Sequence, residues 1–197
     1  MDMNALKKIL TVIVMLGCVG AAAADEFSLE GTGWDKAAAS VGLDPILLYA
    51  VGLVESRTLK SREYTAPHPW TLNSPEGGEF FKTKTEAIAR TSQLFARYKN
   101  LDIGLMQINW GWNGHKYVSS PIELLDPQTN LQVGASILSE AMKSTKDTVL
   151  GIGRYHNWRD ERRAREYGQR VIRVYNALKE LAEPEWYRLA KKENPFL

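Results

Sequence analysis

An apolar stretch from Ile46 to Val54 contains no charged residue. Apolar side chains on every face of a helix indicate burial, and about ten residues are too few to span a membrane. Asp44 and Pro45 precede the stretch and are typical of a helix start, since a carboxylate can accept a first-turn N–H and proline has a helical φ. The pattern predicts the central buried helix of a globular core.

Glu55 follows this stretch and, on a helix, lies in line with Val51 and Gly52. A carboxyl group held against an apolar face loses water, which raises its pKa toward neutrality and keeps it protonated at pH 7. Alternatively, the helix ends near Arg57 and Glu55 lies in its exposed last turn. The stretch alone leaves both interpretations open.

Further helices are predicted from 3.6-residue spacing and from residues that start or stop helices. These are 34–41, 86–98 with Thr85 as its cap, 130–142 opened by Asn130, 148–155 with Asp147 as its cap, and 165–182 closed by Pro184. Residues 60–83 are rich in proline and glycine, and 74–78 (Ser-Pro-Glu-Gly-Gly) predict a small β-hairpin. Residues 121–127 are predicted as a loop. The fold class is mainly α, a helical domain with a central buried helix and a small β-hairpin insertion.

Residues 1–24 have the pattern of a signal peptide. Lys7 and Lys8 precede an apolar run at 9–20, and three alanines at 22–24 form a cleavage signal. No second apolar run follows, so we expect an exported protein, periplasmic or associated with the cell wall, with no transmembrane segment after signal cleavage. About 173 residues then remain, the length of one domain at 25–182, followed by a C-terminal tail at 183–197.

The only cysteine, Cys18, lies in the predicted signal peptide. Residues 15–17 before it do not match the small-residue pattern of a lipidation site, so we expect no lipid anchor there. Without residues 1–24 the formal net charge falls from +2 to +1, which gives no electrostatic reason to expect binding to nucleic acid. The spacing of His68, His115 and His156 is not that of metal ligands, so no metal site is expected.

Three separated motifs occur in order along the chain. Glu55-Ser56 ends the apolar helix, Gly104-Leu-Met-Gln107 follows with Asp102 just before it, and Tyr155 ends a later predicted helix. This ordered set resembles the lytic transglycosylases of the soluble (SLT) family, over about residues 34–181. The resemblance implies a lysozyme-like α+β fold that is largely helical. The third motif, usually Ala-Tyr-Asn, here reads Arg-Tyr-His at 154–156, so His156 takes the Asn position unless Asn157 replaces it.

Members of this family cleave the β-1,4 bond between N-acetylmuramic acid (MurNAc) and N-acetylglucosamine (GlcNAc) in peptidoglycan glycan strands. Ordinary glycosidases use two carboxylates. The resemblance implies only one, Glu55, as a general acid and then a general base that leaves a 1,6-anhydroMurNAc end. It implies no metal and no cofactor.

The resemblance also suggests a set of groove residues. The expected substrate-binding residues are Ser56, Met106, Gln107, Asn109, Tyr155 and His156. Ser56 would hydrogen-bond the Glu55 carboxyl group or, alternatively, only backbone. Gln107 and Asn109 would offer amides to a sugar or satisfy local backbone groups. Tyr155 would hydrogen-bond or orient Glu55 through its hydroxyl.

Several alternatives stay open at this point. Asp102 as a second catalytic group would make a hydrolytic muramidase, but its predicted helix–loop position favours a structural cap. A non-catalytic, wall-binding subunit is a third possibility. Trp110, Trp112 and Trp158 would stack on sugars or lie in the core. The arginines of 154–173 alternate with acidic residues, which predicts a solvated helix face or contact with an anionic wall polymer or partner.

The short single-domain form resembles family members that accompany conjugation, secretion or pilus assemblies. Within these, residues 66–73 (Ala-Pro-His-Pro-Trp-Thr-Leu-Asn) resemble an insertion of transfer-element members. The expected partners are therefore peptidoglycan glycan strands and an assembly of this kind.

Overall fold

The computed structural model describes residues 27–56 and 66–182. The predicted signal peptide with Cys18, and the predicted tail at 183–197, lie outside the described residues. The helices are α2 Gly33–Ala39, α3 Pro45–Ser56, α4 Lys84–Phe95, α5 Pro127–Lys143, α6 Thr148–His156 and α7 Glu161–Ala182, with 3₁₀ helices η1 Gly114–Lys116 and η2 Pro121–Leu125. The strands are β1 Thr71–Ser74, β2 Gly77–Phe80, β3 Asp102–Ile103 and β4 Ile108–Asn109. The predicted fold class, largely helical with a small antiparallel β element, is confirmed.

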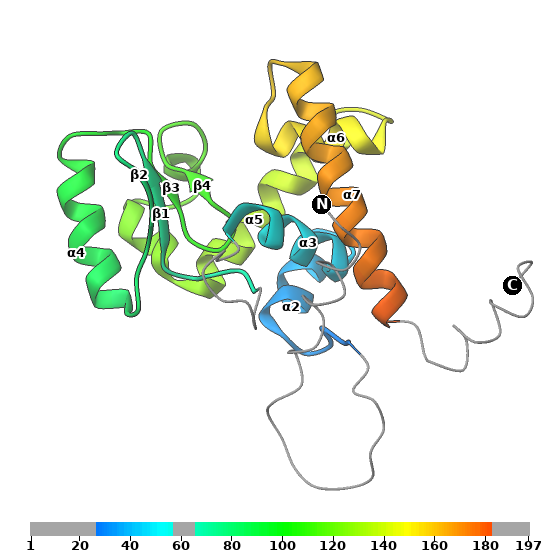
Figure 1. The fold of residues 1–197 in the computed structure, drawn as a ribbon, viewed down its shortest axis with the longest axis horizontal. Coiled ribbons are helices and arrows are strands. Elements are labelled where there is room, and N and C mark those ends of the chain that lie inside the picture. The colour runs from blue at the N-terminus through cyan, green and yellow to red at the C-terminus, as the bar shows by residue number, and fades with distance from the viewer. Residues whose placement is uncertain (1–26, 57–65, 183–197) are drawn as a thin grey trace, which may run out of the picture.

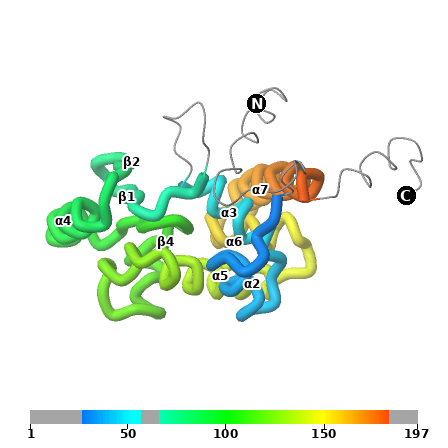
Figure 2. The backbone as a smooth tube through the Cα atoms, turned by 90° about the horizontal axis from the view of Figure 1, so that it is seen from below, coloured from blue at the N-terminus to red at the C-terminus, as the bar shows by residue number. Residues whose placement is uncertain are grey.

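Two groups of elements lie side by side. In Figure 1 the strands and α4 are on one side and α2, α3, α6 and α7 on the other, and Figure 2 shows the same separation from below. Helix α5 joins them, because it contacts α2 and α6 as well as η2 and β4. Within the described part of the chain, no helix combines the length and the apolar character needed to cross a membrane.

Helix α3 is the predicted central helix. The Asp44 carboxylate accepts the Ile46 N–H at 2.8 Å, which is the N-terminal cap expected from the sequence. Leu48, Ala50 and Val51 are fully buried, and α3 contacts α2 and α7. The apolar circumference of this helix is therefore explained by neighbours on opposite faces.

The predicted hairpin is confirmed but belongs to a larger sheet. Ser74 pairs with Gly77 across the turn between β1 and β2. Among the described residues these strands form a four-stranded antiparallel sheet in the order β2-β1-β3-β4. Strands β3 and β4 have two residues each, too short for an alternating pattern to reveal them. Asp102 lies in β3, so its predicted role as a helix–loop cap is wrong.

Some predicted boundaries move by a few residues. Helix α4 is capped by Thr83 rather than Thr85, because Thr83 and Glu86 form a reciprocal capping box. Asp126 caps α5, which begins three residues before Asn130, and α7 begins at Glu161 rather than near residue 165. The predicted loop at 121–127 contains η2, capped by Ser120. Asp147 caps α6 as predicted.

Helices α6 and α7 pack at close range through two glycines. A Cβ atom at Gly153 would overlap the Ala164 backbone, and one at Gly168 would overlap the Val149 carbonyl. Only glycine allows two helix backbones to approach this closely. The close packing holds the C-terminal end of α6 against the first half of α7, where the candidate site lies.

Candidate active site

Glu55 lies in the last turn of α3 with its side chain 14% exposed. The Tyr167 hydroxyl of α7 donates a hydrogen bond of 2.6 Å to its Oε1 atom. Burial raises the pKa of Glu55 to about 7, and the negative charge of Asp102 adds to this, while the Tyr167 hydrogen bond and the Arg170 charge oppose it. Glu55 is thus divided between acid and carboxylate near neutral pH.

His156 packs beside this pair from the end of α6. Its ring stacks on the Tyr167 ring with centroids 4.7 Å apart and planes 1° apart. The His156 Nδ1 atom is 3.9 Å from Glu55 Oε1, longer than a hydrogen bond. Burial lowers the pKa of His156, with a further contribution from Arg170, so the ring is neutral at pH 7 and does not pair with Glu55 as a cation.

Tyr167 was not among the residues singled out from the sequence. Its signal was present, because Tyr167 lies one helical turn before Val171, a residue on the buried face of α7. The spacing predicts this helix only from about residue 165, two residues before Tyr167. A tyrosine on such a face is ordinarily a core residue, and nothing local connects it to Glu55.

The Gly104–Gln107 motif forms a turn whose backbone is fixed from two sides. The Asn130 side chain of α5 accepts the Met106 N–H at 2.8 Å and donates to the carbonyls of Ile103 and Leu124, both at 2.8 Å. The Tyr155 hydroxyl donates to the Met106 carbonyl at 2.7 Å. The prediction that the Tyr155 hydroxyl bonds Glu55 is therefore wrong, since Tyr167 provides that bond.

One other expectation about side chains is also wrong, and for Ser56 the structure shows the second of its two alternatives. The Met106 side chain is fully buried against Gly134 of α5, so it does not line a groove. The Ser56 hydroxyl donates to the Gly52 carbonyl at 3.2 Å and accepts the His68 N–H at 3.1 Å. Ser56 is 1% exposed, and it follows the alternative in which it bonds only backbone groups.

The amides of Gln107 and Asn109 are held by protein groups. Gln107 has a φ of 45°, and its Nε2 atom donates to the carbonyls of Gly104 at 3.0 Å and Thr71 at 3.3 Å. Asn109 donates to Asp102 Oδ1 at 2.8 Å and accepts the Trp112 N–H at 3.0 Å. Each amide thus has one local backbone partner, as one of the two interpretations expected, and a second partner that is either distant in sequence (Thr71) or a side chain (Asp102).

The three tryptophans differ in their surroundings. Trp110 packs edge-on against Phe95, with centroids 5.8 Å apart, and is half-buried. Trp112 and Trp158 are 58% and 59% exposed. Trp110 therefore packs against the core. The other two rings are exposed, with the Arg159 guanidinium 5.4 Å from the Trp112 ring centre and the Arg154 guanidinium 5.5 Å from the Trp158 ring centre.

Among the described residues, no group of three or more His, Cys, Asp or Glu side chains is arranged to hold a metal ion.

The family model described as Transglycosylase SLT domain matches residues 33–177. The chain belongs to the SLT transglycosylase family. The match extends from α2 into the second half of α7 and includes all of the site residues described above, and the resemblance found from the three motifs is confirmed. Membership of the SLT family indicates a lytic transglycosylase that acts on peptidoglycan. No curated protein and no solved structure gave a match.

Proposed function

We propose that Glu55 is the lone general acid and base of a transglycosylase that cleaves the MurNAc–GlcNAc β-1,4 bond and leaves 1,6-anhydroMurNAc. The observation that carries this proposal is the buried carboxyl group with a pKa of about 7, bonded by Tyr167. A group that must first give and then take a proton works best with a pKa near the working pH.

The proposed reaction has two proton transfers. Protonated Glu55 gives its proton to the glycosidic oxygen as the C1–O bond of MurNAc breaks, and GlcNAc leaves with the new hydroxyl. The substrate's own 2-acetamido group stabilises the positive charge at C1. The Glu55 carboxylate then takes the proton of the C6 hydroxyl, whose oxygen bonds to C1. Glu55 is protonated again, and no water is consumed.

The surroundings of Glu55 support this cycle. The Tyr167 hydrogen bond stabilises the carboxylate form that exists between the two steps. Because neighbouring His156 is neutral, it does not trap the carboxylate as an ion pair. Glu55 therefore changes its protonation state at a small cost in free energy.

We further propose that His156, Gln107, Asn109 and Tyr155 border the bound sugar, with Tyr155 acting through the Met106 backbone that it holds. The exposed rings of Trp112 and Trp158 are proposed to stack on sugar faces. Residues 1–24 are proposed to export the protein to the periplasm or cell wall, where it opens peptidoglycan for a conjugation, secretion or pilus assembly.

One observation favours a second candidate, a hydrolytic muramidase. The Asp102 charge contributes to the raised pKa of Glu55. Its two carboxylate oxygens accept hydrogen bonds from Asn73 at 2.9 Å and Asn109 at 2.8 Å, which hold the carboxyl group in place. Two carboxyl groups on either side of the scissile bond are the arrangement of ordinary glycosidases, and Asp102 is the candidate for the second group.

Digestion of purified sacculi separates these functions. Wild-type protein should release muropeptides that are one water lighter than hydrolysed ones, and Glu55→Gln should lose roughly a thousandfold in rate. Glu180→Gln, which removes an exposed carboxylate from α7, is the matched control and should keep full activity. Hydrolysed products that disappear with Asp102→Asn would establish the muramidase instead. Equal rates for wild type and Glu55→Gln would refute the role of Glu55.

A further inference from the structure

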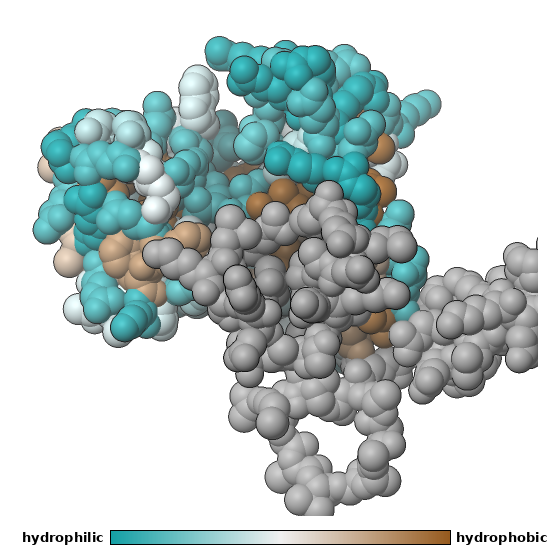
Figure 3. All heavy atoms as spheres, in the orientation of Figure 1, coloured by the Kyte–Doolittle hydropathy of each residue, from teal (hydrophilic) through white to brown (hydrophobic). Residues whose placement is uncertain are grey.

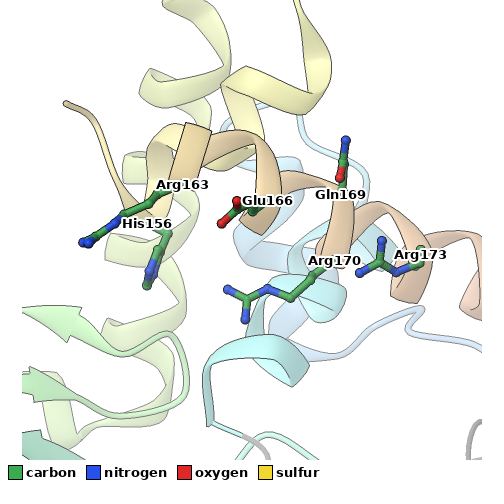
Figure 4. A pocket seen from close by; sticks show the side chains of 6 residues that line it. All are labelled: His156, Arg163, Glu166, Gln169, Arg170 and Arg173. Carbon is green, nitrogen blue, oxygen red and sulfur yellow. The ribbon is translucent and has the colours of Figure 1, made fainter. Parts of the chain in front are cut away.

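Helix α7 carries a row of charged side chains beside the candidate active site, three of them arginines. Arg163, Glu166, Arg170 and Arg173 follow one another at intervals of three and four residues, so they share one face of the helix. With His156 and Gln169 they line a pocket of about 380 Å³, and Figure 4 shows these side chains along α7 and beside the end of α6. In Figure 3 the surface over α6 and the first half of α7 is mainly hydrophilic.

The charges in this pocket are unevenly paired. Glu166 accepts from Arg162 at 2.6 Å, and Arg163 lies 3.4 Å from Asp160. Among residues 27–56 and 66–182, neither Arg170 nor Arg173 has a carboxylate within 4 Å. The pocket thus offers two guanidinium groups to an anion, and a guanidinium fork matches a carboxylate in two parallel hydrogen bonds.

This pocket adjoins Glu55 through shared residues. His156 lines the pocket and stacks on Tyr167, whose hydroxyl bonds Glu55. The Arg170 guanidinium carbon lies 5.5 Å from the centre of the Tyr167 ring, which orients it by a cation–π contact. Arg170 therefore lies beside the tyrosine that bonds Glu55, and Arg173 lies one turn further along the same face of α7.

We propose that Arg170 and Arg173 form a subsite for the carboxylates of the stem peptide on the reacting MurNAc residue. This inference rests on the proposed function, because it places the cleaved bond at Glu55. The stem peptide branches from the lactyl group of that sugar and carries free carboxylates. A phosphodiester polymer joined at O6 does not fit the same position, since that oxygen must be free to attack C1.

The test compares two soluble substrates at one pH: glycan strands with intact stem peptides, and strands from which an amidase has removed them. Arg173→Gln should lower kcat/KM on peptide-bearing strands by about tenfold and leave it within about twofold on bare strands. Arg170→Gln should act in the same direction. The Arg170 charge also lowers the pKa of Glu55, so Arg170→Gln changes the rate on both substrates. For this variant only the ratio of kcat/KM between the two substrates tests the subsite.

The matched control is the double variant Lys143→Gln/Lys146→Gln, which removes one exposed positive charge at the last residue of α5 and one just after it, and should leave the ratio unchanged. Equal losses on both substrates would overturn the subsite. Inhibition of the wild type by poly(glycerol phosphate) on both substrates alike, abolished by Arg173→Gln, would also overturn it and would assign the arginines to a phosphodiester polymer.

A separate measurement keeps the subsite testable without catalysis. In the Glu55→Gln background, Arg173→Gln should weaken binding of peptide-bearing strands by about tenfold and leave binding of bare strands unchanged. If wild-type protein cleaves neither strand but this difference in binding is found, the proposed chemistry fails and the subsite stands. Equal binding of both strands overturns the subsite, whatever the chemistry.

Discussion

The hydroxyl of Tyr167 donates a 2.6 Å hydrogen bond to the carboxyl group of Glu55, 112 residues earlier in the chain. Burial raises the pKa of Glu55, and this bond is the largest of the effects that lower it. The value of about 7 is the balance between them. Helix α7 therefore does more than cover α3, since it sets the proton affinity of the candidate acid.

Replacing Tyr167 with phenylalanine should raise the pKa of Glu55 further, because the donor that stabilises the carboxylate is lost. The alkaline limb of the pH–rate profile should move to higher pH. At the same time kcat at pH 7 should fall about tenfold, because the carboxylate formed between the two proton transfers loses its hydrogen bond. The control is Tyr175→Phe on the same helix, which removes a 2.8 Å hydrogen bond to Asp44 at the other end of α3. A profile that moves equally in both variants would contradict a specific role for Tyr167.

Glu55→Gln should change how stability depends on pH. The pKa of Glu55 is about 7 in the folded protein, raised from 4.5. Between these values the unfolded chain has lost this proton while the folded protein keeps it, so the free energy of unfolding of the wild type falls as the pH rises. The two proteins should have similar free energies of unfolding below pH 4.5. The variant should gain up to about 3 kcal/mol relative to wild type by pH 8. Urea titrations at several pH values measure this, and a difference independent of pH would refute the raised pKa.

Asn130 should be among the most sensitive polar positions outside the proposed chemistry. Asn130→Ala leaves the Met106 N–H and the carbonyls of Ile103 and Leu124 without their buried partner. We expect a loss of at least about 3 kcal/mol in the free energy of unfolding. Gln132→Ala, an exposed amide on the same helix, should stay within about 0.5 kcal/mol of wild type. A loss below about 1 kcal/mol for Asn130→Ala would show that water replaces the amide.

The cap of α4 gives a test of local structure. Thr83→Ala removes an acceptor for the Glu86 N–H and should cost about 1 kcal/mol. Thr85 lies inside the helix, where alanine has the higher helix propensity, so Thr85→Ala should be neutral or slightly stabilising. Thermal unfolding of the two single variants distinguishes them. Equal losses would argue that α4 begins elsewhere.

The elements that the sequence predicts well are determined by residues close to one another in the chain. Asp44 and Pro45 fix the start of α3, the apolar run at 46–54 marks it as buried, and the turn at 74–78 marks the hairpin. The sequence pattern predicts Thr85 as the cap of α4. Thr83 is the cap in the structure, because only Thr83 has Glu86 three residues later. In each case the deciding groups lie within one turn of each other.

The sequence by itself determined the family motifs, the central helix and Glu55 as the candidate acid. Only the tertiary structure decided which groups surround that acid: Tyr167 rather than Tyr155 bonds it, Asp102 lies in a strand, and Arg170 and Arg173 line a pocket beside it. The physical reason is the separation along the chain over which each effect acts. Helix periodicity and capping act within a few residues, whereas burial, hydrogen bonding and charge act between side chains that only the packing of α3, α6 and α7 brings together.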